Sequence, residues 1–131
     1  MAKKTTRTRK QAALPEVADN TILINCMTPC SPCDVLAHKC ITPTFRSWAE
    51  GAGYAVVYSK DAAKVAGYWQ RYGKPHKVLQ ATPQVYVVGE NQACKGVCVR
   101  AGAKVGGYEI PAYDKWNAEM LKEICKRLGV K

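Results

Sequence analysis

The sequence lacks the features that would place the protein in a membrane or a secretory pathway. No apolar run approaches the roughly 18 residues that a membrane-spanning helix needs. Residues 1–20 contain basic side chains, but no apolar segment of the kind found in a secretory signal follows them. We see no internal repeat in the 131 residues. We therefore expect one cytoplasmic globular domain that makes no contact with a membrane.

The first ten residues contain no acidic side chain, although the chain as a whole has ten. We interpret residues 1–12 as a disordered basic arm and residues 13–131 as the single domain. Such an arm either attracts nucleic acid by releasing counterions or is simply solvated, and the sequence leaves both interpretations open. Half of the formal net charge of +10 comes from five residues of this arm, namely Lys3, Lys4, Arg7, Arg9 and Lys10.

Cysteine is abundant, with seven residues, but the number is odd. At least one cysteine cannot pair within the chain, whereas a secreted disulfide scaffold is expected to have an even set. This pattern indicates a reducing compartment, in which most of the thiols act as small apolar side chains. We expect such packing roles for Cys26, Cys40, Cys94, Cys98 and Cys125.

Hydrophobic patterning predicts an α/β domain with the element order β-α-β-α-β-β-α. The first β-α-β unit must form a right-handed parallel crossover, and the last two strands form a hairpin, which gives a mixed four-stranded sheet. The predicted strands are 21–26, 54–58, 84–88 and 94–100. The first predicted helix covers 34–41 and continues over 44–50, the second covers 60–72, and the last starts at Pro111. The last helix has an apolar stripe made of Trp116, Met120, Leu121, Ile124 and Leu128.

The motif Cys30-Ser31-Pro32-Cys33 lies between a buried strand and the first turn of a helix. This position within a β-α-β unit favours a redox dithiol. The helix N-terminus stabilises a thiolate, so we expect the pKa of Cys30 to fall below its ordinary value of about 8.5. Cys33 is expected to face inward and to resolve the mixed disulfide, while Pro32 suits an early helix position.

Zinc binding is the alternative for these thiols. Cys30, Cys33, Cys94 and Cys98 have spacings that a four-cysteine site tolerates. In the predicted sheet, however, the third strand runs away from the dithiol, so Cys94 lies at the far end of the hairpin and the four thiols do not meet. We therefore favour redox chemistry, with no metal and no other bound cofactor.

The strand, the Cys-x-x-Cys loop and the helix resemble the active site of the thioredoxin superfamily. Thr82-Pro83 precedes a hydrophobic strand, where that family has a cis-proline. The resemblance covers about residues 20–130 and is nearer the glutaredoxin outline. It implies a minimal thioredoxin-like fold with helices on both faces of the sheet and a cis bond before Pro83. It also implies that substrate lies across Cys30 in extended conformation, beside Thr82, Pro83 and Pro32.

The sequence departs from the family pattern at the dithiol. Pro29 stands where thioredoxins usually have tryptophan, and Ser31 where glutaredoxins usually have an aromatic residue. Thioredoxins bury an acid in the preceding strand to move protons to the second cysteine, but residues 21–26 contain none. Proton transfer from Cys33 therefore needs water or another group. Asp34 adds a negative charge that opposes a thiolate.

These observations predict a thiol–disulfide oxidoreductase that acts on a disulfide in a protein or a small molecule. A separate reductase or glutathione would recycle it. The alternative is a redox-inactive thioredoxin-fold module, with an interaction or structural role in a nucleic-acid-associated assembly of a bacterium or phage. The basic arm would help such a module to join the assembly.

Overall fold

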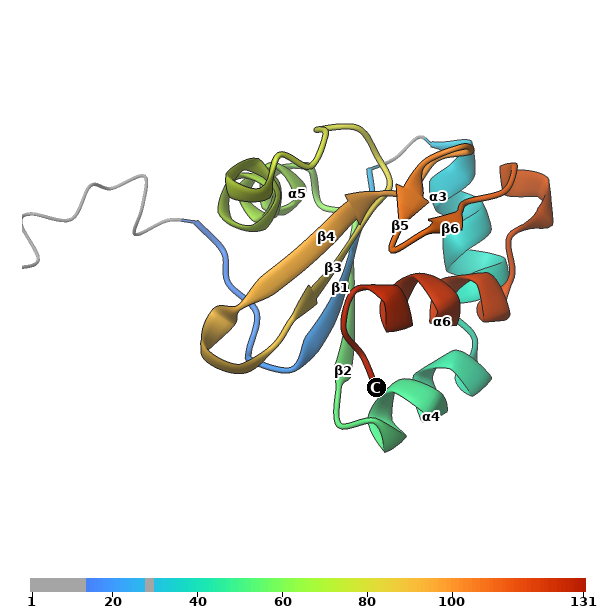
Figure 1. Ribbon diagram of the computed structural model, residues 1–131. Coiled ribbons are helices and arrows are strands. Elements are labelled where there is room, and N and C mark those ends of the chain that lie inside the picture. The colour runs from blue at the N-terminus through green and yellow to red at the C-terminus, as the bar shows by residue number, and fades with distance from the viewer. Residues whose placement is uncertain (1–13, 28–29) are drawn as a thin grey trace, which may run out of the picture.

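A mixed four-stranded sheet forms the centre of the molecule. The computed structural model describes residues 14–27 and 30–131, so the predicted arm, residues 1–12, lies outside the described residues. β1 (Thr21–Asn25) pairs in parallel with β2 (Ala55–Ser59) and antiparallel with β3 (Gln84–Val88), and β4 (Cys94–Cys98) pairs antiparallel with β3. The sheet order is β2-β1-β3-β4 (Figure 1), which confirms the predicted mixed sheet.

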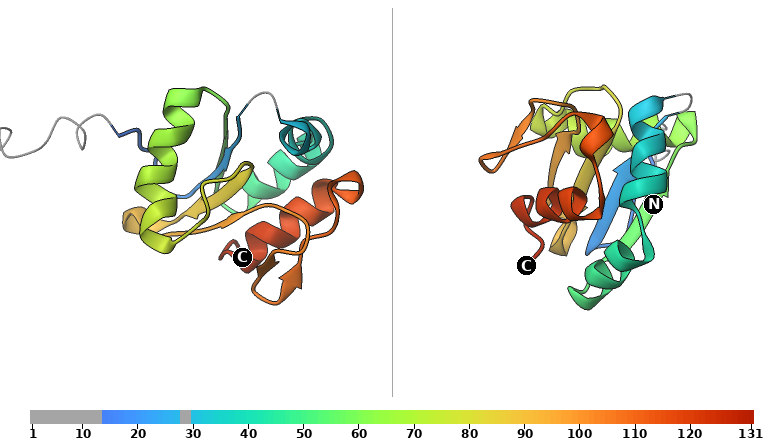
Figure 2. Two further views of the ribbon diagram at one scale, coloured as in Figure 1. Left: turned by 90° about the horizontal axis from the view of Figure 1, so that it is seen from above. Right: turned by 90° about the vertical axis from the view of Figure 1, so that its right-hand side faces the viewer.

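Helices cover both faces of the sheet (Figures 1 and 2). One face carries α3 (Ser31–Val35), its π-helical continuation η1 (Leu36–Cys40), α4 (Pro43–Gly51) and α6 (Ala118–Arg127). The other face carries α5 (Ala62–Tyr68), which continues as η2 (Trp69–Gly73) and the short 3-10 turn η3 (Lys74–His76). Each face has its own hydrophobic cluster, so β1 is buried along its whole length.

Local capping explains where the helices begin. The Thr42 hydroxyl accepts a hydrogen bond from the main-chain N–H of Phe45 at 3.1 Å, and Pro43 occupies the first turn of α4, where its missing N–H is not needed. Asp61 caps α5 by accepting from the N–H of Lys64 at 3.0 Å. Pro43 therefore starts a new helix after η1 rather than bending one continuous helix.

The last helix begins later than predicted. We expected it to start at Pro111, but α6 begins at Ala118, after the 3-10 turn η5 (Tyr113–Lys115). The side chain of Asn117 accepts from the N–H of Met120 at 2.9 Å and so caps α6, which explains the boundary. All five side chains of the predicted apolar stripe are buried, with Met120, Leu121 and Ile124 inside α6 and Trp116 and Leu128 just beyond its two ends.

No strand was predicted in the glycine-rich segment between β4 and α6. This segment contains a second hairpin, in which β5 (Lys104–Val105) pairs with β6 (Tyr108–Glu109). Gly106 and Gly107 both have positive φ angles, +54° and +85°, which the tight two-residue turn requires. β3 has its predicted bounds, and β1, β2 and β4 differ from theirs by one or two residues. The turn η4 (Glu90–Gln92) joins β3 to β4.

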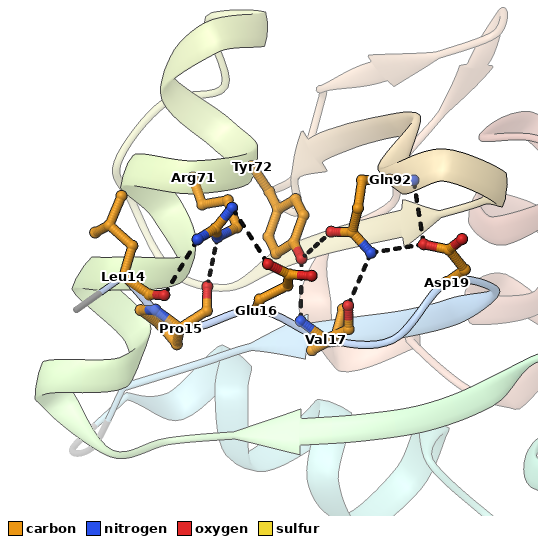
Figure 3. A network of polar contacts seen from close by, with 8 residues as sticks. All are labelled: Leu14, Pro15, Glu16, Val17, Asp19, Arg71, Tyr72 and Gln92. Atoms are coloured by element: carbon orange, nitrogen blue, oxygen red, sulfur yellow. Dashed lines mark hydrogen bonds and ion pairs between the residues drawn. The ribbon is translucent and has the colours of Figure 1, made fainter. Parts of the chain in front are cut away.

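Residues 14–20, which we call the N-terminal strap, lie across α5, η2 and η4 (Figure 3). The Arg71 guanidinium donates to the carbonyl of Pro15 at 2.7 Å. The N–H of Val17 donates to the Tyr72 hydroxyl at 3.0 Å, and this hydroxyl donates to Gln92 at 2.7 Å. The Val17 side chain is buried in the second cluster. The strap is therefore part of the domain.

Within residues 14–27 and 30–131, no helix has the length and the apolar composition needed to cross a bilayer.

Candidate active site

The two cysteines of the motif lie at the start of α3. Cys30 is half-buried and occupies the N-cap position, and Cys33 is completely buried one turn later. The N–H of Cys33 donates to the Cys30 sulfur at 3.4 Å, which satisfies one of the main-chain donors that a helix N-terminus leaves unpaired. The predicted inward orientation of Cys33 is thus confirmed, and Cys30 is the more accessible sulfur of the pair.

The segment before β3 reaches the same place. The Thr82 hydroxyl lies 3.6 Å from the Cys30 sulfur, and the Thr82–Pro83 peptide bond is cis, as predicted. Pro83 is buried, and its carbonyl accepts from the N–H of Val99 at 2.8 Å. Pro32 is half-buried in the first turn of α3, between the two cysteines. The fold therefore brings Thr82 next to the Cys30–Cys33 pair, from which it is far away in the sequence.

A third thiol belongs to this group. Cys26 directly follows β1, is completely buried, and donates its main-chain N–H to the carbonyl of Ser59 at 2.8 Å. Its side chain belongs to the same buried cluster as that of Cys33, and the half-buried Tyr58 packs against this cluster. Sequence reasoning gave Cys26 a packing role, at the end of the strand near the dithiol. The signal available in the sequence was the position of Cys26, two residues after Ile24 and at the end of the strand that leads to the motif.

The charge distribution within the dithiol differs from the prediction. The pKa of Cys33 is lowered to about 6, chiefly because the Cys26 thiol donates a hydrogen bond to its sulfur, and the thiol of Cys30 adds a second. The pKa of Cys30 is raised, because its thiol is partly desolvated and hydrogen-bonded to Cys33. The expectation that Cys30 has the lowered pKa is therefore wrong. The negative charge of the pair resides on Cys33, which receives more hydrogen bonds.

The other thiols have a different environment. Burial raises the pKa of Cys40 and of Cys94 to about 12, and it also raises the pKa values of Cys98 and Cys125. Cys94 and Cys98 belong to the cluster on the α5 face of the sheet, whereas Cys30 and Cys33 belong to the opposite cluster. The four thiols weighed as a zinc site thus lie on two sides of the sheet. Among the described residues, no group of three or more His, Cys, Asp or Glu is arranged to hold a metal ion.

Comparisons with protein-family models, with curated proteins and with solved structures found no match for this chain. The chemistry of the site therefore has to be derived from its geometry. An accessible thiol hydrogen-bonded to a buried thiol with a lowered pKa can exchange with a disulfide and then close into a disulfide of its own.

Proposed function

We propose that the protein is a thiol–disulfide oxidoreductase in which Cys30 attacks the substrate and Cys33 resolves the mixed disulfide. The observation that carries this proposal is the asymmetry of the pair: a half-exposed Cys30 sulfur rests against a completely buried Cys33 with a lowered pKa. Of the two cysteines, Cys30 is the one placed to meet a disulfide from solution. Cys33 is protected from alternative oxidants until Cys30 has reacted.

The first exchange uses Cys33 as the base for Cys30. In the reduced pair one proton is shared between the two sulfurs, and it passes from Cys30 to Cys33 as Cys30 attacks a substrate sulfur. The sulfur–sulfur bond of the substrate breaks, a bond forms between Cys30 and one substrate sulfur, and the other substrate sulfur leaves as a thiolate that takes a proton from water.

The second exchange closes the protein disulfide. Cys33 gives its proton to water and attacks the Cys30 sulfur, which forms the Cys30–Cys33 bond and releases the second substrate sulfur as a thiolate that is protonated by water. The substrate has then gained two electrons from the protein and two protons from water, while the protein has lost two electrons and the one proton that the pair shared. A dithiol reductase or glutathione would return the protein to its reduced form. The odd number of cysteines favours a reducing, cytoplasmic compartment for this cycle.

The surroundings of the dithiol support a thioredoxin-type fold as the setting for this chemistry. The sheet order, with β2 parallel and β3 antiparallel to β1, and helices on both faces agree with that fold. The contact of Thr82 with Cys30 puts the start of β3 beside the reactive sulfur. An extended substrate segment would therefore cross Cys30 next to Thr82, Pro83 and Pro32.

Reduction of insulin disulfides in the presence of a thiol reductant tests the proposal. Cys30→Ser should abolish turnover, and Cys33→Ser should accumulate a mixed disulfide between Cys30 and the substrate, visible by mass spectrometry. Cys40→Ala is the matched control, because Cys40 is equally buried in the same cluster but has no hydrogen bond to the dithiol. Turnover that survives in Cys30→Ser would contradict the proposal.

One observation favours the alternative, a module that associates with nucleic acid. Lys77, Arg100 and Lys104 line an open groove of about 280 Å³ beside β4, which gives the described residues a basic surface of their own. Deletion of residues 1–12 would remove five further positive charges. The alternative predicts that this deletion lowers both the affinity for nucleic acid and the salt dependence of binding, and that Cys30→Ser changes neither. It also predicts that the wild type lacks reductase activity. If all three results are found, the alternative is correct.

A further inference from the structure

Four buried side chains that can form hydrogen bonds lie in one row across the sheet, which we call the polar row. The strand register pairs Asn25 with Ser59 of β2 and with Gln84 of β3, and it pairs Gln84 with Cys98 of β4. Paired residues point to the same face of a sheet, and Cys98 belongs to the hydrophobic cluster on the α5 face. The dithiol belongs to the cluster on the opposite face, so the sheet separates it from the polar row.

Hydrogen bonds connect the polar row to the segment that precedes β3. The Asn25 amide donates to the side-chain oxygen of Gln84 at 3.1 Å, and the Tyr86 hydroxyl donates to the same oxygen. This arrangement turns the nitrogen of the Gln84 amide to the other side, where it donates to the carbonyl of Ala81 at 3.1 Å. The Cys98 thiol donates to the same carbonyl at 3.3 Å. The Ala81 carbonyl is therefore held by side chains from two strands, β3 and β4.

This carbonyl belongs to the peptide group that joins Ala81 to Thr82. A peptide group is planar, so two hydrogen bonds to its oxygen fix the direction in which the main chain enters Thr82. After Thr82, the Pro83 carbonyl accepts a hydrogen bond from the N–H of Val99 at 2.8 Å. The main chain is thus held on both sides of Thr82, whose hydroxyl lies 3.6 Å from the Cys30 sulfur.

We propose that Gln84 and Cys98 are positioning residues of the proposed active site. Through the Ala81 carbonyl they hold Thr82 where its hydroxyl meets the Cys30 sulfur. This inference rests on the proposed function, and it gives the α5 face of the sheet a part in the reactivity of a cysteine on the opposite face. Gln84 and Cys98 act through Thr82 and not by contact with the substrate.

The composition of β3 supports a positioning role for its first residue. β3 is buried along its whole length, and the residues that follow Gln84 are three valines and one tyrosine. Burying an amide costs free energy unless it is hydrogen-bonded, and an apolar side chain would pack in β3 without this cost. The amide supplies a donor aimed at the Ala81 carbonyl, and Asn25 and Tyr86 orient it. Asn25 is itself anchored to α5, because its amide also donates to the carbonyl of Val65 at 3.0 Å.

The position of the Thr82 hydroxyl matters because a cysteine attacks as the thiolate. A donor that is hydrogen-bonded to the sulfur stabilises this form. The Thr82 hydroxyl can donate to the Cys30 thiolate only while the main chain keeps it close to the sulfur. Loss of a hydrogen bond to the Ala81 carbonyl should therefore slow the reactions of Cys30.

The rate at which iodoacetamide alkylates Cys30 tests the inference on the full-length reduced protein, with peptide mapping by mass spectrometry to follow each cysteine. Gln84→Met removes the amide and keeps the length of the side chain, and Cys98→Ala removes the thiol. Each substitution should slow the alkylation of Cys30 near neutral pH by about two- to three-fold. Cys98→Ser keeps a donor and should restore most of the wild-type rate. If Gln84→Met does not fold, the two Cys98 variants decide.

Two substitutions are matched controls. Ser59→Ala changes the same polar row, and within the part of the chain that the structure describes the Ser59 hydroxyl has no hydrogen-bond partner. Cys94→Ala changes the other thiol of β4 that packs on the α5 face, and this thiol donates to the carbonyl of Lys95 instead. Neither control should change the alkylation rate of Cys30.

A double-mutant cycle with Thr82→Val shows whether the two residues act through the Thr82 hydroxyl. This variant has no hydroxyl to misplace, so adding Gln84→Met or Cys98→Ala to it should not slow Cys30 further. General loosening of the fold would have a different result, because it exposes buried thiols such as Cys125 and speeds their alkylation.

Unchanged Cys30 rates in both Gln84→Met and Cys98→Ala would overturn the inference. Equal slowing with and without the Thr82 hydroxyl would also overturn it, and so would faster alkylation of Cys125 in place of slower alkylation of Cys30. The proposed function fails separately. If the wild type forms no Cys30–Cys33 disulfide while the rates change as expected, Gln84 and Cys98 position Thr82 beside a thiol that does not serve disulfide exchange.

Discussion

The main-chain N–H of Cys33 donates a hydrogen bond to the sulfur of Cys30 over 3.4 Å, so one sulfur atom both caps α3 and forms the accessible side of the dithiol. The two roles can be separated by substitution. Cys30→Ser keeps an acceptor for the cap, whereas Cys30→Ala removes it.

We expect both Cys30 variants to lose disulfide reduction. Cys30→Ala should in addition be less stable than Cys30→Ser by about 1 kcal/mol, the usual contribution of a helix N-cap. Urea denaturation of the two reduced variants measures this difference. If the two are equally stable, the contact between the Cys33 N–H and the Cys30 sulfur does not contribute to capping.

The Thr82 hydroxyl should tune the reactivity of Cys30. Its hydrogen bond lowers the pKa of Cys30 against the larger effect of burial. Thr82→Val keeps the shape and removes the hydroxyl, so Cys30 should be alkylated a few-fold more slowly near neutral pH. Thr44→Val, at an exposed position of α4, is the control and should leave the rate unchanged. Equal rates in all three proteins would exclude this role of Thr82.

Stability should depend on pH through Cys33. The folded-state pKa of Cys33, about 6, lies below the ordinary value of a cysteine thiol, so the folded protein binds fewer protons than the unfolded chain between these two pKa values. The free energy of unfolding of the reduced protein should therefore rise as pH increases from about 6 to 9, and this gain is lost as pH falls back through the folded-state pKa.

Denaturation series at several pH values, with Cys33→Ala as the control, measure this effect. The control should lack the rise, because no thiol with a lowered pKa remains in the dithiol. Parallel curves for the wild type and Cys33→Ala would show that the folded state does not favour a thiolate at Cys33.

The N-terminal strap depends on the absence of a side chain at Gly67. A Cβ at this position would overlap the ring of Pro15, which lies directly on α5. Gly67→Ala should destabilise the protein by about 1–3 kcal/mol, as overpacking does, even though alanine favours helix. Gly51→Ala in α4, where a Cβ meets no atom within 4 Å, should be neutral or stabilising.

Thermal or chemical denaturation of the two glycine variants gives the comparison. If Gly67→Ala is as stable as Gly51→Ala, the strap does not pack on α5 as described.

The order of the strands and the burial of the α6 stripe were predictable because both follow from local pattern. β1 is a short apolar run covered on both faces, and the residues from Trp116 to Leu128 recur at helical spacing. The motif from Cys30 to Cys33 was also readable, because its position between a strand and a helix fixes which thiol is the more exposed.

The charge on the dithiol was not predictable from the motif alone. The helix N-terminus favours a thiolate at Cys30, but the hydrogen bond from Cys26 to Cys33 outweighs this effect, and that contact depends on how β1, β2 and α3 pack. The start of α6 was missed because Pro111 is a common first helical residue, whereas the Asn117 cap decides the boundary. The pair Gly106-Gly107 is a usable signal of the second hairpin, because two adjacent glycines suit a two-residue turn.

The account depends most directly on whether Cys30 and Cys33 form a reversible disulfide. Equilibration of the full chain in glutathione buffers of graded ratio, followed by alkylation of the remaining thiols and peptide mapping, measures this. We predict that one disulfide forms, that it joins Cys30 to Cys33, and that the other five cysteines stay alkylatable after unfolding. A chain in which Cys30 and Cys33 remain thiols at every ratio, or in which the first disulfide joins a different pair, would contradict the account.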